Sequence, residues 1–136
     1  MRLLLDTSFI IQLKKRNPKA IAMLNEFKKD AEDILISSLS MYELLCGAHY
    51  ILKKYNSITE LKQIERILSY LTEVPVDSNV AWKAAEVRAK LLLNGVTVPE
   101  IDLLIACSAD EAKILTFDKD FLKLKQYGFD VLVTAD

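Results

Sequence analysis

The stretch MRLLLDTSFI, residues 1–10, decides how this chain can fold. Three consecutive leucines end on Asp6, and the hydroxyl residues Thr7 and Ser8 follow directly. An unbroken apolar run of this kind is typical of a strand that is covered on both faces, as in parallel sheets. A carboxylate at the end of such a run requires an explanation, because a buried charge is costly unless it is paired.

Four further short apolar runs resemble the first, and helical patterns separate them. The predicted strands are Arg2–Leu5, Ile34–Ser37, Glu73–Val76, Ile114–Phe117 and Asp130–Val133. The predicted helices are Pro18–Lys29, Leu39–Leu52, Thr59–Leu71, Asn79–Leu93 and Ile101–Ala112, the last of them apolar nearly all round. Strands that alternate with helices predict an α/β fold with a parallel sheet, whose ligands bind beyond the carboxyl ends of the strands.

Composition limits the classes of protein that fit. The chain has 136 residues, which predicts a single domain, 1–136, and 51% of them are hydrophobic. Lysine and arginine number 18 against 19 aspartates and glutamates, so overall charge predicts no strong affinity for nucleic acid. A polyanion would have to bind through local basic residues or a bound cation. We expect a cytoplasmic protein, because no signal peptide or membrane-spanning run is evident.

Two cysteines, Cys46 and Cys107, lie in apolar helical patterns, and we expect both to be buried, reduced thiols. His49 is the single histidine and has no partner in the sequence pattern, so we expect a surface position for it. A Ser–His–Asp or Cys–His site is therefore unsupported, and no glycine-rich phosphate loop is present.

Five acidic residues are placed at one edge of the predicted sheet. Asp6 ends the first strand, and Glu43, in SLSMYELLCG, lies in the first turn of the helix after the second strand. Asp102, in VPEIDLLIACSA, lies in the first turn of another helix, while Asp118 and Asp120, in LTFDKDF, follow the fourth strand. In a parallel sheet these positions meet at the carboxyl edge.

Each acid also has a purely structural interpretation. Asp6 or Thr7 can cap a helix, and Ser40 with Glu43 matches the capping box S-x-x-E. The remaining acids are common at helix starts and in turns. Taken together, however, clustered carboxylates repel and raise one another's pKa unless a cation neutralises them. Carboxylates suit Mg²⁺ or Mn²⁺, and such an ion activates water for attack on a phosphodiester, the one nucleophile that this sequence supports well.

The arrangement resembles the PIN-domain nucleases, most closely the VapC-like toxins of type II toxin–antitoxin pairs. The stretches that match are LLLDTSFI, SMYELLCG, GVTVPEIDLLIACSA and ILTFDKDF, in this order. The resemblance implies a three-layer α/β/α fold around a five-stranded parallel sheet, Mg²⁺ or Mn²⁺ as cofactor, and endonucleolytic cleavage of RNA. It also implies a homodimer and a small cognate antitoxin protein as partners.

The resemblance assigns roles residue by residue. The catalytic and metal-binding acids would be Asp6, Glu43, Asp102 and Asp118. Supporting residues that line the pocket would be Thr7, Ser8, Thr116 and Asp120. Whether Asp118 or Asp120 is the fourth ligand stays open at this point.

Basic residues near the acidic motifs are candidates for contact with RNA: Lys14, Lys15, Arg16 and Lys119. Their alternative role is to keep a solvated surface. Trp82 is expected in packing or in a dimer contact. Two other functions compete with an endoribonuclease: a phosphatase or phospho-acceptor domain, against which Ser8 at the second position after Asp6 counts, and a non-catalytic PIN-like module that binds RNA or protein.

Overall fold

The computed structural model describes residues 1–134, and its centre is a five-stranded sheet in the order β3-β2-β1-β4-β5. All four pairings are parallel, and β1 is the middle strand. The strands are β1 (Arg2–Leu5), β2 (Asp33–Ser37), β3 (Thr72–Val74), β4 (Ala112–Thr116) and β5 (Asp130–Val133). The first residues of the chain therefore form the core of the sheet, as the unbroken leucine run predicts.

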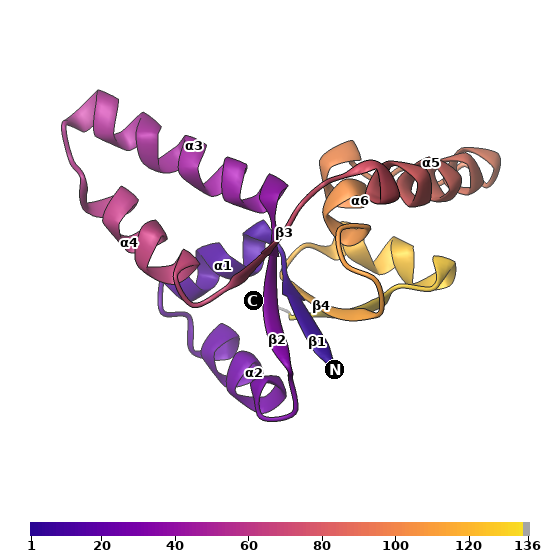
Figure 1. The fold of residues 1–136 in the computed structure, drawn as a ribbon, viewed down its shortest axis with the longest axis horizontal. Coiled ribbons are helices and arrows are strands. Elements are labelled where there is room, and N and C mark those ends of the chain that lie inside the picture. The colour runs from indigo at the N-terminus through magenta and orange to yellow at the C-terminus, as the bar shows by residue number, and fades with distance from the viewer. Residues whose placement is uncertain (135–136) are drawn as a thin grey trace.

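Helices cover both faces of the sheet, which confirms the predicted three-layer α/β/α architecture (Figure 1). One layer contains α1 (Thr7–Lys14), α2 (Pro18–Lys28), α3 (Ser38–Tyr55) and α4 (Thr59–Leu68). The other contains α5 (Ser78–Leu93), α6 (Glu100–Ala106) and the 3₁₀ helix η1 (Lys119–Tyr127). Within the described residues no helix is both long enough and apolar enough to cross a membrane.

The leucines of β1 divide between two apolar cores. Leu3 and Leu5 pack with the first helical layer, whereas Leu4 packs with the second. All three side chains are fully buried. This alternation follows from the two-residue period of a strand, and it explains why the run contains no polar residue until the strand ends.

Predicted boundaries are accurate for β1 and β5 and within a few residues for most other elements. The largest error is at α6, which ends at Ala106 rather than Ala112. The Ser108 hydroxyl donates to the Leu104 carbonyl at 2.8 Å, and β4 begins at Ala112 to pair with β1. The helices α1 and η1 are not among the predicted elements.

Two predictions about α3 are wrong. Its N-cap is Ser37, whose hydroxyl accepts from the Leu39 N–H at 3.2 Å, so Ser40 and Glu43 do not form a capping box and Glu43 lies in the second turn. Cys46 is exposed, because it lies on the solvent side of α3, opposite the buried Leu44 and Ala48. Cys107 is buried as expected, and burial raises the pKa of its thiol to about 11.

Candidate active site

Asp6 is a buried helix cap at the centre of the carboxyl edge. Its Oδ1 accepts from the Phe9 N–H at 2.9 Å, which caps α1, and its side chain is almost completely shielded from solvent. The Ser8 hydroxyl and the Thr116 hydroxyl also donate to its carboxylate. Burial nevertheless dominates and raises the pKa of Asp6 to about 6. The carboxylate is therefore held in a fixed position at an energetic cost to the folded protein.

Hydroxyl groups connect Asp6 to the loop after β4. The Thr116 Oγ1 accepts from the Asp118 N–H at 2.9 Å, and the Ser8 Oγ accepts from the Phe117 N–H at 3.0 Å. The same hydroxyls contact Asp6. Ser8 and Thr116 thus fix the backbone that carries Asp118 relative to the end of β1, which explains why small hydroxyl residues occupy both positions.

Glu43 extends from α3 toward α1. The Thr7 Oγ1 donates to Glu43 Oε1 at 2.6 Å and lies 3.0 Å from the Ser40 Oγ. Ser40 is fully buried one helical turn before Glu43, on the same face of α3. Sequence reasoning missed Ser40 as a site residue, although its three-residue spacing from Glu43 is the signal that places both on one face.

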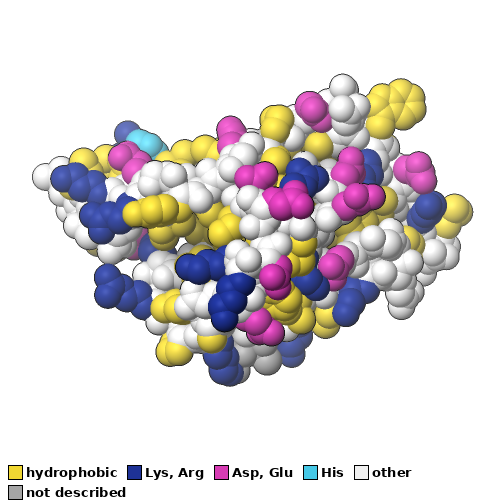
Figure 2. All heavy atoms as spheres, turned by 60° about the horizontal axis from the view of Figure 1, so that its bottom comes forward, with side chains coloured by type: hydrophobic (Ala, Val, Ile, Leu, Met, Phe, Trp, Pro, Cys, Tyr) yellow, Lys and Arg dark blue, Asp and Glu magenta, His cyan; other side chains and the backbone are white. Residues whose placement is uncertain are grey.

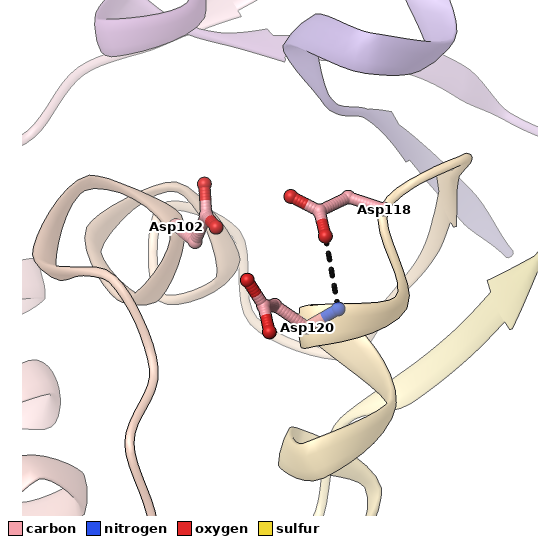
Figure 3. A group of neighbouring side chains, drawn as sticks. All are labelled: Asp102, Asp118 and Asp120. Carbon is pink, nitrogen blue, oxygen red and sulfur yellow. Dashed lines mark hydrogen bonds between the residues drawn. The ribbon is translucent and has the colours of Figure 1, made fainter.

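Asp102, Asp118 and Asp120 form a tight group of carboxylates (Figure 3). Each offers one carboxylate oxygen, and these oxygens lie within 4.8 Å of one another. Asp118 caps η1 by accepting from the Asp120 N–H at 2.9 Å, which turns the two side chains toward Asp102 on α6. Asp120, expected only in a supporting role, is as much a member of this group as Asp118.

Asp102 shows the electrostatic strain of the cluster most clearly. Partial burial, followed by the nearby charge of Asp118, raises the pKa of its carboxyl to about 7. Asp6, Glu43 and Asp120 add to the same effect in smaller measure. The structure therefore brings Asp102, Asp118 and Asp120 together, whereas Asp6 and Glu43 lie outside this group and influence the pKa of Asp102 through their charge.

The basic residues predicted to contact RNA differ in their exposure and in their pairing with acids. Lys119 is exposed between Asp118 and Asp120, and Lys15 and Arg16 are exposed at the end of α1. Lys14 forms a partly buried ion pair with Glu60 of α4 at 2.6 Å. Lys14 also lines a hollow of about 160 Å³ together with Thr7 and Glu43, so this pair lies beside the acidic pocket.

The donor set of the acidic cluster fits a hard divalent cation. Its ligand atoms are carboxylate oxygens, without a histidine or cysteine among them. Among the described residues, the group forms one ion pair, between Asp120 and Lys123 at 3.2 Å. Oxygen donors in this number suit Mg²⁺ or Mn²⁺, which bind a few carboxylates and complete their shell with water and phosphate oxygens.

The fold and this site define a class: α/β proteins with a cluster of carboxylates at the carboxyl edge of a five-stranded parallel sheet. A family model described as PIN domain matches residues 3–127. The chain therefore belongs to the PIN domain family.

Similar solved structures agree with this assignment in their fold. VapBC2 from Rickettsia felis bound to a promoter DNA fragment aligns with a TM-score of 0.84 and 23% identity, over 98% of this chain and 99% of that one. DNA-bound VapBC from Salmonella typhimurium aligns with a TM-score of 0.81 and 25% identity, over 98% of both chains. VapBC-5 from Mycobacterium tuberculosis aligns with a TM-score of 0.70 and 25% identity, over 99% of this chain and 98% of that one. A search of curated proteins finds no match.

Proposed function

We propose that residues 1–136 form one nuclease domain, a Mg²⁺- or Mn²⁺-dependent endoribonuclease that acts as the toxin of a toxin–antitoxin pair. The observation that carries the proposal is the three-carboxylate group of Asp102, Asp118 and Asp120, together with the effect of the Asp6 and Glu43 charges on the pKa of Asp102. The chain's membership of the PIN domain family supports the same activity.

The roles of the residues follow from their environments. A divalent ion, when bound, lowers the pKa of water and stabilises negative charge on phosphoryl oxygens. Asp102, Asp118 and Asp120 would hold this ion, and the buried Asp6 would supply a fixed carboxylate behind them. Thr7 orients Glu43, while Ser8 and Thr116 orient Asp6. Asp102, whose pKa is raised to about 7 by burial and by the neighbouring carboxylates, would gain most from the neutralising charge of this ion.

The reaction would add water across one P–O bond of the RNA backbone, leaving a phosphate on one fragment and a hydroxyl on the other. The 2′-hydroxyl of the substrate has no part in this reaction. Cleavage is therefore expected to continue when the nucleotide before the scissile bond carries a 2′-O-methyl group. This outcome separates water attack from the internal attack used by metal-independent ribonucleases.

The decisive experiment measures cleavage of labelled single-stranded RNA with purified protein. We expect cleavage in Mg²⁺ or Mn²⁺, loss of cleavage in EDTA, and at least a 100-fold lower rate for Asp6→Asn and Asp102→Asn. The matched control is Glu26→Gln, an exposed acid on α2. RNA binding without cleavage under all conditions would instead identify a non-catalytic binding module.

An antitoxin partner is supported by the similar structures of VapBC, of which VapBC-5 belongs to a family of toxin–antitoxin systems. The partner would be a small protein that closes the acidic pocket. The expected result is that co-expression with its cognate antitoxin relieves growth arrest, and that the purified complex cleaves RNA more slowly than the free chain. Equal cleavage by the complex would contradict the proposal.

A homodimer through α5 is supported by the exposed apolar side chains of this helix. Trp82, Leu92 and Leu93 are 79%, 71% and 86% exposed, beside a hollow of about 450 Å³ lined by alanines of α5. Apolar surface of this kind is typical of a contact with another chain, and an alanine-lined hollow accepts the large side chains of a second copy. Light scattering is expected to give a dimer for the wild type and a monomer for Leu92→Lys with Leu93→Lys.

A further inference from the structure

A second hollow lies between the end of α1 and α4, away from the carboxylates. It has a volume of about 160 Å³ and is lined by Leu13, Lys14, Arg16, Gln63, Arg66 and Ile67. Three of these side chains are cationic and one is an amide. No acidic residue lines it.

The two arginines of this hollow have no anionic partner. Arg16 and Arg66 make no ion pair among the described residues, whereas Lys14 is held by Glu60. Two unpaired guanidinium groups around one hollow repel each other, and this repulsion is relieved when an anion binds between them. Arginine presents a planar fork of donors that matches phosphate oxygens, and the Gln63 amide adds another donor.

Lys14 connects this basic hollow to the acidic pocket. The same lysine lines the hollow that contains Thr7 and Glu43. The two hollows therefore meet at one side chain, which places the basic hollow next to the hollow that contains Glu43.

The distribution of charge supports this route. Residues 14–29 contain six lysines and arginines and one glutamate, although the whole chain is close to neutral. In Figure 2 dark blue side chains lie at the left, on the side of α3 and α4 in Figure 1, and others lie among the magenta ones at the centre and right. The basic excess is therefore local to the end of α1 and to α2.

We infer that the hollow formed by Lys14, Arg16, Gln63 and Arg66 binds the phosphodiester backbone of single-stranded RNA and leads it to the acidic pocket. The inference rests on the proposed function for its substrate, but the binding step itself needs no metal. Contacts to the backbone position a strand without reading its sequence. Glu60 opposes this binding, because it neutralises Lys14 and adds a negative charge at the junction of the two hollows.

Arg16 offers a variant that separates binding from folding. It follows the C-cap of α1 in the left-handed conformation, at φ 58°, where glycine is usually preferred. Arg16→Gly is therefore expected to raise the melting temperature while it removes a phosphate contact. Reduced RNA binding by a more stable protein cannot result from unfolding.

The test titrates a fluorescent single-stranded RNA of about 12 nucleotides in EDTA, where metal-dependent cleavage does not occur, at several salt concentrations. Each phosphate contact contributes about 0.7 to the slope of log affinity against log salt. Arg16→Gly with Arg66→Gln is expected to lower the slope by about 1.4 and the affinity roughly 20-fold near 0.1 M salt. The control, Lys29→Gln with Lys125→Gln, removes two exposed charges outside the hollow and is expected to change the slope much less.

Glu60→Gln supplies the opposite result, a gain of affinity of about fivefold, as expected for one additional phosphate contact. The inference is overturned if the wild type does not bind RNA in EDTA, if the arginine pair changes the slope no more than the control pair, or if Glu60→Gln weakens binding. An unchanged slope would also mean that the hollow serves another partner, such as an acidic protein segment. If RNA binds as expected but Mg²⁺ never produces cleavage, the proposed function fails while this binding site stands.

Discussion

Thr116 Oγ1 donates a hydrogen bond to Asp6 Oδ2 and so joins the carboxyl ends of β4 and β1 across 110 positions of sequence. The same oxygen accepts from the Asp118 N–H. One buried hydroxyl therefore couples two of the acids in the candidate active site. Its geometry depends on the parallel pairing of β1 with β4 in the centre of the sheet.

Thr116→Val is expected to destabilise the protein by about 1.5–3 kcal/mol, because it removes a buried hydrogen bond to a carboxylate at almost constant volume. The bond to Thr116 lowers the pKa of Asp6, so this pKa is expected to rise further in the variant. Urea denaturation near neutral pH measures the loss. Thr97→Val, at an exposed position, is the control. Equal losses in both variants would show that the Thr116 hydroxyl has no such role.

Stability without divalent ions is expected to fall as pH rises from about 4 to about 7. The pKa values of Asp6 and Asp102 are raised to about 6 and about 7, so the folded chain binds more protons than the unfolded chain in this range. By linkage, the free energy of unfolding decreases as these groups ionise. Asp102→Asn is expected to flatten the dependence and to melt at a higher temperature than the wild type at pH 8 in EDTA. Glu26→Gln is the control, and an unchanged slope in Asp102→Asn would contradict the explanation.

Mg²⁺ or Mn²⁺ is expected to raise the melting temperature at pH 7.5, and to raise it less at pH 5.5, where protons compete for the carboxylates. A ligand at 100 times its dissociation constant stabilises a protein by about 2.7 kcal/mol. Asp118→Asn and Asp120→Asn, measured separately, determine which of the two contributes more to binding. If neither substitution reduces the shift, the ion does not bind in the group that these acids form with Asp102.

The fold was predictable because β1 is both the most apolar segment and the central strand. The edge that gathers the acids follows from the parallel order alone, so Asp6, Glu43 and Asp102 could be placed near one another from sequence. The helices α1 and η1 were not predicted. The helix α1 begins directly after the acid that ends β1, and η1 has the tighter 3₁₀ geometry. The inclusion of Asp120 in the tight group depends on how Asp118 caps η1, which spacing alone does not reveal.

The exposure of Cys46 shows a second limit of sequence reasoning. An apolar helix can present cysteine to either side, and only the packing of Leu44 and Ala48 against the sheet decides which side faces solvent. Cys46 is therefore expected to react with a thiol reagent at pH 8 within minutes, whereas Cys107, buried and with a pKa near 11, reacts only on unfolding. Cys46→Ser identifies the fast site. Fast modification of Cys107 in the folded protein would contradict its burial.

Arg88 is expected to hold the start of α6, and with it Asp102. Its Nη2 donates to the Val98 carbonyl at 2.9 Å and lies 3.3 Å from Glu100 Oε2. Arg88→Met leaves the carbonyl of the buried Val98 without this donor, which is expected to cost about 1–3 kcal/mol and to reduce the thermal shift caused by Mg²⁺.

The contrasting variant for Arg88 is Glu100→Gln, which removes only the exposed partner of the ion pair. It is expected to cost less than about 1 kcal/mol and to leave the Mg²⁺ shift unchanged, because exposed ion pairs contribute little. Arg88 thus acts through the backbone at Val98 rather than through its charge on Glu100. Denaturation and thermal shift of the two variants side by side measure the difference, and equal effects in both would assign the role of Arg88 to the ion pair instead.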